Sequence, residues 1–235
     1  MPPSIVVHWL EDSRAQRILW LLEELGLEYE VKKYQRNPKT NLAGPELKAV
    51  HPLGKSPVVV ITDGAHSTTL AESGAIVEFL IERYGEGKLA VPPTTANIQD
   101  RTDYLYWLHS AEGSFMFPLM LAMIFTKMPT QAPWFVRPVV SGISSGALGT
   151  AIKPRLRDQF GFFNAALEGK DFLVAGQLTG ADIMMSFIAE ALEMAPVDIA
   201  DYPNITRWFD AMKKRETYVK AEERGGKNDM GRFLR

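Results

Sequence analysis

The pattern of apolar residues changes its character once, at residues 85–95, and this change restricts the fold more than any other feature of the chain. Before it, short runs rich in β-branched residues alternate with runs of helical period, whereas only helical periods follow it. The segment itself joins Gly85-Glu86-Gly87-Lys88 to Val91-Pro92-Pro93, which is too stiff and polar for a core element. We therefore expect a domain at residues 1–85, a linker at 86–95 and a second domain at 96–235.

The first domain is predicted to be mixed α/β, in the order β-α-β-α-β-β-α. Extended segments are expected at residues 5–8, 28–34, 58–61 and 68–70, and helices at residues 13–25, 45–50 and 73–84. The first helix has the firmest pattern, because Ile18, Leu22 and Leu25 recur at helical spacing and Gly26 supplies a left-handed stop.

The second domain is predicted to be all helical. Helices are expected at residues 97–127, 154–167, 179–193 and 203–215. Residues 129–149, rich in Pro, Gly and Ser, fit either a long loop or a broken helix, and the charged tail after Tyr218 shows no core-forming period. The apolar run from Phe115 to Phe125 has 11 residues, short of the ~20 that span a bilayer, so we expect a buried helix.

Composition excludes several classes of function. Lys and Arg number 26 against 28 Asp and Glu, a net charge of -2 that offers no positive field for nucleic acid or an anionic membrane. The first residues have neither a signal peptide nor a transit peptide pattern, so we expect a cytoplasmic protein without an integral membrane segment. Because the chain has no cysteine, any thiol chemistry must use the sulfur of a bound molecule.

Four short motifs occur in a characteristic order. They are Ser13-Arg14, His51-Pro52-Leu53-Gly54-Lys55-Ser56-Pro57, Ala71-Glu72-Ser73-Gly74 and Leu178-Thr179-Gly180-Ala181-Asp182-Ile183. With these motifs nearly the whole chain resembles the cytosolic glutathione transferases, above all fungal and bacterial members whose first helix reads Ser-Arg-x-x-Arg-x-Leu-Trp-Leu-Leu. The resemblance implies a thioredoxin-like α/β N-terminal domain, an all-α C-terminal domain and a homodimer.

The same resemblance implies a reaction. Glutathione would be the co-substrate, its thiol would attack a small hydrophobic electrophile, and no metal would take part. Two alternatives stay open at this point: a noncatalytic glutathione-binding carrier or regulatory protein, and a peroxidase that uses the thiolate of glutathione itself.

Ser13 is the candidate catalytic residue that the resemblance implies. One hydrogen bond to a charged group is worth about 1.5 to 3 kcal/mol, and lowering a thiol pKa by two units takes about 2.7 kcal/mol, so one hydroxyl could suffice. A structural interpretation competes, because Ser13 and Gln16 form a capping-box pattern. The two roles are compatible, since a hydroxyl donates one proton and accepts through separate lone pairs. Trp9 and Leu10 stand where tyrosine-type transferases carry their hydroxyl, which disfavours a tyrosine mechanism.

Two acidic residues, Glu11 and Asp12, come directly before Ser13. Like charge would raise the pKa of a neighbouring thiol unless these carboxylates point away. We expect Arg14 and Arg17 to offset them.

The resemblance also implies the glutathione-binding residues. Ser56 and a cis Pro57 would present backbone groups to the cysteinyl part, and Lys55 would meet the glycine carboxylate. Glu72 would bind the γ-glutamyl ammonium, and Ser73, at a helix N-terminus, the γ-glutamyl carboxylate. The structural alternatives are a trans proline, a solvated lysine and a serine that only caps its helix.

Other conspicuous residues fit structural roles. Five apolar residues fit a core stripe better than the lining of an electrophile pocket: Trp9, Leu10, Phe115, Met116 and Leu119. His109 fits a helix surface. Thr179 and Asp182 form a capping box, which we expect to serve folding and not chemistry.

Overall fold

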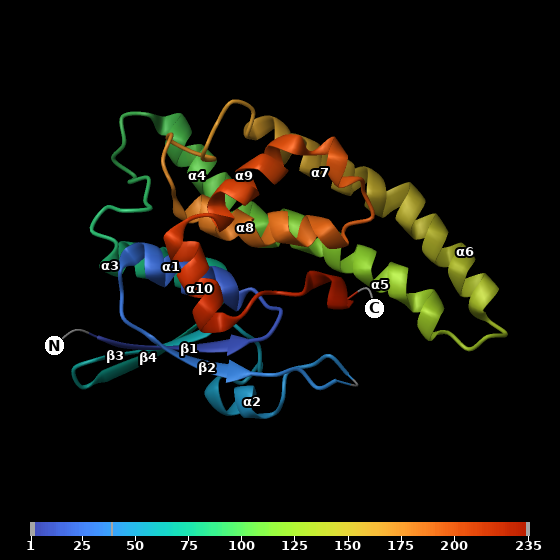
Figure 1. Ribbon diagram of the computed structural model, residues 1–235, viewed down its shortest axis with the longest axis horizontal. Helices are drawn as coiled ribbons and strands as arrows, with labels where there is room; N and C mark the ends of the chain where they lie inside the picture. Colours follow the sequence, from blue (N-terminus) through green and yellow to red (C-terminus); the bar gives the residue numbers. More distant parts are fainter. Residues whose placement is uncertain (1–2, 39, 234–235) are drawn as a thin grey trace.

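A computed structural model describes residues 3–38 and 40–233 of the chain. It confirms a thioredoxin-like N-terminal domain with a mixed four-stranded sheet and an all-helical second domain. In Figure 1 two helices of the first domain cover one face of the sheet, a short third helix lies on the other face, and the helical domain stacks on the first two.

The N-terminal domain has the predicted order of elements. These are β1 (Ser4–Leu10), α1 (Ala15–Leu25), β2 (Glu30–Tyr34), α2 (Glu46–Val50), β3 (Val58–Asp63), β4 (His66–Ala71) and α3 (Ser73–Tyr84). The strands lie in the order β2-β1-β3-β4, with β1 parallel to β2 and antiparallel to β3, and with β3 and β4 forming a hairpin. Gly26 ends α1 with a φ of 71°, which confirms the left-handed stop.

The second part of the chain is helical. Its helices are α4 (Ile98–Ser110), the π-helical η1 (Ala111–Met116), α5 (Phe117–Gln131), α6 (Arg137–Ala147), the π-helical η2 (Leu148–Ile152), α7 (Lys153–Ala166), α8 (Gly180–Ala191), α9 (Pro203–Lys213) and α10 (Glu216–Gly225). Short 3-10 turns are η3 (Leu192–Met194), η4 (Ile199–Asp201) and η5 (Met230–Phe233). Helix α5 continues through Pro129 and α6 follows a short turn, so the two form a hairpin that projects beyond the sheet (Figure 1).

Helices α4, η1 and α5 form one continuous run, Ile98–Gln131. By length and composition this run is apolar enough to cross a membrane, and 44% of its most apolar window is buried inside the protein. The expected burial of residues 115–125 is correct for one face only. Phe115 and Leu119 are buried, whereas Phe117 and Ile124 are 57% and 48% exposed, so a helix buried throughout is the wrong description.

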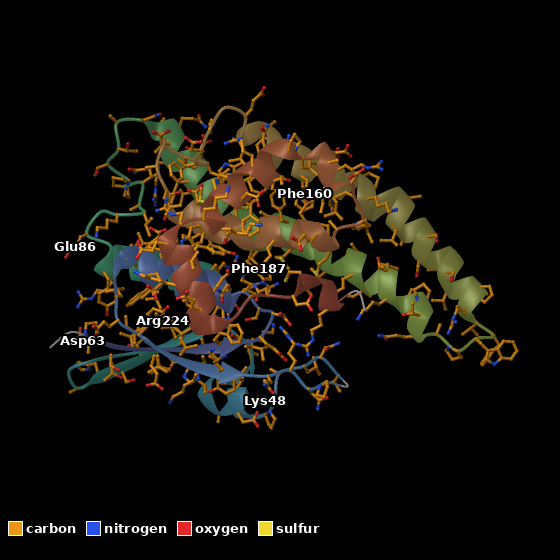
Figure 2. The ribbon with its side chains drawn as sticks, in the orientation of Figure 1. Lys48, Asp63, Glu86, Phe160, Phe187 and Arg224 are labelled. Carbon is orange, nitrogen blue, oxygen red and sulfur yellow. The ribbon has the colours of Figure 1, made fainter. Side chains whose placement is uncertain are left out.

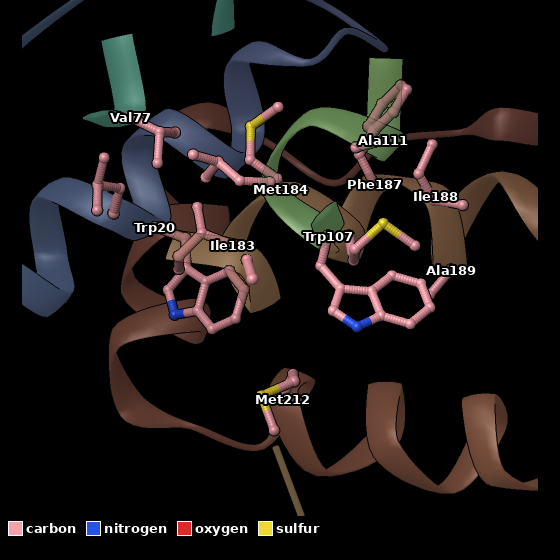
Figure 3. Packing of buried hydrophobic residues seen from close by; sticks show 14 of the residues in the cluster. Trp20, Val77, Trp107, Ala111, Ile183, Met184, Phe187, Ile188, Ala189 and Met212 are labelled. Atoms are coloured by element: carbon pink, nitrogen blue, oxygen red, sulfur yellow. The ribbon is translucent and has the colours of Figure 1, made fainter. Parts of the chain in front are cut away.

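Helix α8 joins the two domains into one core. It packs against α1, α3 and α4, and buried residues of all four helices belong to one hydrophobic cluster. Figure 3 shows Ile183 and Ile188 of α8 among this packing, with Trp20 of α1 and Trp107 of α4 close by. The position of α1, and of the loop before it, is therefore fixed by both domains.

The start of α8 confirms the structural role of the Thr179–Asp182 pair. Asp182 Oδ2 accepts from the amide and the hydroxyl of Thr179, at 2.9 and 3.0 Å, and Oδ1 accepts from the Leu173 amide at 2.9 Å. Burial raises the pKa of Asp182 to about 6, although these hydrogen bonds favour the anion. The carboxylate thus holds together the helix start and the loop in front of it.

The charged segment after Tyr218 shows no core-forming period in the sequence, yet it contributes to the core. Helix α10 packs on α1 and buries Tyr218 and Ala221, and beyond it Met230 is 3% exposed. At Gly225 a Cβ atom would lie 2.6 Å from Gln16 Oε1 and 2.7 Å from Leu19 Cδ1, so any larger residue would force these side chains of α1 to move. The periodicity is hard to see in the sequence because the buried side of α10 is short and contains two small residues.

Arg224, labelled in Figure 2, lies on α10 and contacts the first domain. Its guanidinium lies 4.4 Å from the ring centre of Tyr29 and donates to the Tyr29 carbonyl at 3.2 Å. It also lies 3.2 Å from Glu23 of α1. The charge of Arg224 therefore ties α10 to the first domain.

Candidate functional site

The predicted site residues leave the sheet at one edge. His8 of β1 pairs with Val58 of β3, and Val58 pairs with Ala71 of β4. Since β1 and β4 both run antiparallel to β3, the C-terminal ends of β1 and β4 and the N-terminal end of β3 lie at the same edge of the sheet. The residues next to these three strand ends are therefore neighbours. They are the end of β1 with the loop to α1 (residues 9–14), the Ser56–Pro57 pair and the Glu72–Ser73 pair.

The Ser56–Pro57 peptide bond is cis, as the resemblance implies. Ser56 Oγ donates to the His8 carbonyl at 2.8 Å and accepts from the Leu10 amide at 3.1 Å. Because the one proton of this hydroxyl is donated to β1, the donors that the Ser56 loop can offer a ligand come from its backbone. Lys55, the residue before, is exposed.

Glu72 and Ser73 differ sharply in exposure. Glu72 is exposed and has a φ of 70°, a backbone conformation that non-glycine residues rarely adopt and that clusters at functional sites. Ser73 begins α3, is 4% exposed, and accepts at Oγ from Arg17 Nη2 at 2.7 Å. The Ser73 hydroxyl therefore already holds an arginine, and Glu72 is the member of the pair open to solvent.

Arg17 connects the site to the helical domain. Its side chain is almost fully buried, and it donates to the Met184 carbonyl at 2.9 Å, to Ser73 and to the carboxylate of Glu112. Burial lowers the pKa of Arg17, and the neighbouring Glu112 opposes that change. Glu112 lies in the π-helical segment η1, a type of distortion that is frequent at functional sites.

This pairing overturns one expectation. Arg14 and Arg17 were expected to offset Glu11 and Asp12, but both guanidiniums face Glu112, with Arg14 Nε 3.1 Å from its carboxylate. The sequence did contain a signal for the central role of Arg17. A charged residue inside an apolar helical stripe is buried only when it has partners.

The carboxylates of Glu11 and Asp12 turn instead to other partners. Glu11 Oε1 accepts from the Arg36 amide at 2.7 Å and lies 2.9 Å from Arg232 Nη1. Asp12 Oδ2 lies 3.0 Å from the same Arg232 nitrogen, and its Oδ1 accepts from the Asp229 amide at 2.7 Å. Burial works against the Glu11 anion, yet the hydrogen bonds from Arg36 and Arg232 outweigh it and lower the pKa of Glu11.

Ser13 lies in the loop between β1 and α1 and is 6% exposed. Its Oγ accepts from the Ala15 amide at 3.2 Å, so it does bind a free amide at the start of the helix. The predicted capping box with Gln16 is wrong, because Gln16 Oε1 accepts from Trp9 Nε1 at 3.2 Å. The bond from Ala15 uses only a lone pair of the hydroxyl, which leaves the Ser13 proton for another acceptor.

The residues assigned to structural roles have those roles. Trp9, Leu10, Phe115, Met116 and Leu119 are all buried, and the side chain of His109 is 61% exposed, with Nε2 3.9 Å from Glu78. Helix α5 carries three exposed apolar residues that were not predicted as site residues: Phe117, Met120 and Ile124. Their spacing of three and four residues is the signal that could have revealed them. Met120 Sδ lies 4.0 Å from Arg14 Nη2, so this apolar face of α5 lies beside the loop that carries Ser13.

A cleft of about 380 Å³ lies next to the site, between β2, the loop after β1 and the C-terminal tail. Its lining residues are Trp9, Glu11, Asp12, Lys33, Tyr34, Gln35, Lys227, Asp229 and Arg232. Since Ser13, Ser56 and Ser73 do not line it, this cleft is a neighbour of the predicted site. Within residues 3–38 and 40–233, no group of three or more His, Asp or Glu gathers where it could hold a metal ion.

A thioredoxin-like domain with a cis-proline at the sheet edge, sharing its core with an all-helical domain, defines the fold class of the glutathione transferases. Family models agree: residues 2–82 match "Glutathione S-transferase, N-terminal domain" and residues 128–216 match "Glutathione S-transferase, C-terminal domain". The chain belongs to the glutathione S-transferase family.

Individual relatives extend over nearly the full length. Glutathione S-transferase 1 of Saccharomyces cerevisiae is 36% identical over 231 residues, which cover 94% of this chain and 95% of that protein. A glutathione S-transferase structure from Actinobacillus pleuropneumoniae has 35% identity and a TM-score of 0.76, covering 97% of this chain and 96% of its own. The glutathione transferase URE2P8 from Phanerochaete chrysosporium, determined with oxidized glutathione, shares the fold at 23% identity, a TM-score of 0.68 and 94% coverage of each chain.

Proposed function

We propose that the protein is a glutathione transferase that binds glutathione at this sheet edge and activates its thiol for attack on small hydrophobic electrophiles. The observation that carries the proposal is the convergence of the cis-prolyl loop, the Glu72–Ser73 pair and Ser13 at the same edge. Membership of the family and the glutathione found with URE2P8 support the choice of ligand.

The binding groups match the charges of the tripeptide. The exposed Glu72 carboxylate would bind the γ-glutamyl ammonium, and the start of α3 at Ser73 would bind the γ-glutamyl carboxylate, with Arg17 behind it adding positive charge. Backbone groups of Ser56 and Pro57 would hold the cysteinyl part, and Lys55 would meet the glycine carboxylate.

Ser13 would donate its free proton to the thiolate, and the dipole of α1, whose Ala15 amide already bonds the Ser13 hydroxyl, would add to that stabilisation. At pH 7, lowering the thiol pKa from about 8.5 to about 6.5 raises the fraction of glutathione present as thiolate from about 3% to about 76%. The intrinsic reactivity falls roughly 8-fold over the same change, so the net gain is only about threefold. Most of the acceleration must therefore come from holding sulfur and electrophile together.

The apolar face of α5 is suited to the second reactant. Phe117, Met120 and Ile124 are 57%, 45% and 48% exposed, and Met120 contacts Arg14 beside Ser13. An electrophile that covers them would be desolvated next to the sulfur. The sulfur would form the new bond to carbon, the leaving group would depart with its electron pair, and the thiol proton would pass to solvent.

Calorimetry with glutathione, together with turnover of several small aromatic and alkyl halides, tests this function. We expect binding and turnover in the wild type, and a large loss of turnover without a comparable loss of binding in Ser13→Ala. Ser13→Thr, which keeps a hydroxyl, is the matched control and should retain more activity. Binding without turnover on any electrophile would instead identify a carrier, and unchanged activity of Ser13→Ala would leave Ser13 as a helix-start residue only.

Two further properties are typical of the family, and we extend them to this chain. They are a homodimeric assembly and a cytoplasmic location. Light scattering at micromolar concentration tests the first, and a mass of one chain would refute it. Fractionation of the source cells tests the second.

A further inference from the structure

We propose that Arg232, near the end of the chain, is a positioning residue for the thiol site, because it neutralises the two carboxylates that come directly before Ser13. The inference rests on the proposed function. Residues 226–233, which we call the C-terminal tail, would then influence the charge around Ser13 in the N-terminal domain.

The geometry places one guanidinium on both carboxylates. Arg232 Nη1 lies 2.9 Å from Glu11 Oε1 and 3.0 Å from Asp12 Oδ2. Asp12 has a φ of 50°, so the chain turns sharply at the residue next to Ser13. The carboxylate of Asp12 thus belongs to the residue that positions the Ser13 backbone at this turn.

Several contacts hold the tail in this place. The Asp229 amide donates to Asp12 Oδ1 at 2.7 Å, and Asn228 Nδ2 donates to Glu190 Oε2 of α8 at 2.8 Å. Met230 is buried in the hydrophobic core. These contacts at residues 228–230 anchor the tail directly before Arg232, which keeps its guanidinium at the carboxylates.

Other charged groups face the same carboxylates, and their contacts differ from those of Arg232. Lys33 and Tyr34 of β2 line the cleft with Lys227 and Asp229 of the tail, and Glu190 faces Asp12 from α8. Arg36 donates through its guanidinium to the carbonyl oxygens of Glu11 and Asp12, at 3.0 and 3.1 Å. Arg36 therefore holds the loop backbone and, through its amide, the Glu11 carboxylate, whereas the guanidinium of Arg232 contacts both carboxylates.

The consequence concerns the bound thiol. A glutathione thiolate bound at Ser13 would lie beside the two residues, Glu11 and Asp12, whose carboxylates are negative. Like charge disfavours formation of the thiolate. With Arg232 in place the two carboxylates are paired and turned toward the tail, which removes most of that opposition. Without Arg232 the same loop would raise the thiol pKa that Ser13 lowers.

The test is the apparent pKa of enzyme-bound glutathione, from thiolate absorbance and from the pH profile of kcat/KM. In Arg232→Gln we expect both to move upward by about half a unit or more, while Arg232→Lys retains much of the wild-type value. Lys227→Gln is the matched control, because it removes one positive charge from the same tail and cleft without a contact to Glu11 or Asp12. It should shift the thiol pKa much less.

A double variant distinguishes loss of the Arg232 charge from detachment of the tail as the cause of a shifted thiol pKa. Asp12→Asn with Arg232→Gln removes a carboxylate together with its partner, so the thiol pKa should return toward the wild-type value. If the double variant stays as shifted as Arg232→Gln, neutralisation is not the role of Arg232. Hydrogen exchange at the Asp229 amide reports in the same samples whether the tail is still docked.

The failures of the two proposals can be told apart. If the wild type binds glutathione with a lowered thiol pKa and Arg232→Gln leaves that pKa unchanged, this inference is overturned and the proposed function stands. If the wild type does not bind glutathione, both are overturned.

Discussion

The guanidinium of Arg17 donates to the hydroxyl of Ser73 at 2.7 Å, joining the first turns of α1 to the first residue of α3. The same guanidinium contacts Glu112 and the Met184 carbonyl in the helical domain. One buried cation therefore holds together both domains and two segments of the predicted glutathione site. Changes at Arg17 should affect stability and ligand binding together.

Replacing Arg17 by Met should destabilise the fold by about 3 kcal/mol, because the Met184 carbonyl and the Ser73 hydroxyl lose their donor and Glu112 is left with Arg14 as its partner. Urea unfolding measures the change. The double variant with Glu112→Gln should lose less than the sum of the losses of the two single variants, since Arg17 and Glu112 contact each other directly. A loss below about 1 kcal/mol in Arg17→Met would show that the buried contacts contribute little.

Replacing Glu72 by Ala should weaken glutathione binding roughly 10- to 100-fold with the fold intact, since the ammonium would lose a charge-assisted hydrogen bond of about 1.5 to 3 kcal/mol. Glu86→Ala is a close control, because Glu86 is also exposed and also has a positive φ, of 49°. Calorimetry compares the two variants. Equal affinities of Glu72→Ala and the wild type would refute the placement of the ammonium.

Replacing Thr179 by Ala should cost about 1 kcal/mol or somewhat more, because α8 loses one half of its capping box. Thr102→Ala provides the comparison: Thr102 is exposed and its hydroxyl donates to the Ile98 carbonyl within α4. That change should stay within about 0.5 kcal/mol. Equal unfolding midpoints for wild type and Thr179→Ala would show that the box does not stabilise the domain.

Glu190 should make stability depend on pH. Burial raises its pKa to about 7, even though Asn228 donates to the carboxylate. Because this folded-state pKa lies above the unfolded value of 4.5, the stability contribution is fully present below 4.5 and is lost as pH rises through 7. Glu190→Gln stays neutral at every pH. Its free energy of unfolding should therefore rise relative to that of the wild type as pH rises, by up to about 3 kcal/mol above neutrality.

Unfolding midpoints of both proteins in mildly acid and mildly alkaline buffer measure that difference. Glu216→Gln, at an exposed position of α10 that pairs with Lys220, serves as the control for a general effect of removing a glutamate. If the gap between Glu190→Gln and the wild type stays constant with pH, the carboxyl of Glu190 does not titrate in this range.

The sequence predicted the order of elements wherever a local signal fixed them. Helical spacing and Gly26 defined α1, and the capping box with its apolar neighbours defined α8. Helix α10 was not recognised as a core element because its burial depends on Tyr218 and small residues meeting α1, which lies far away in the sequence. Local periodicity contains no information about such a contact.

In the predicted site, too, local motifs were informative and contacts between distant residues were not. Motifs found Ser13, Ser56 and Glu72 and implied the cis-proline, and the structure brings these segments to one sheet edge. The partners of the charged residues could not be predicted, since Arg232 lies 220 positions from Asp12. Only the folded chain shows which arginine meets which carboxylate.

The most direct measurement is the titration of glutathione bound to the wild-type protein, followed by thiolate absorbance. We predict saturable binding and a bound thiol pKa at least about one unit below the free value of about 8.5. Absence of binding at millimolar glutathione, or binding with an unshifted thiol pKa, would contradict the claim that this sheet edge captures and activates the thiol.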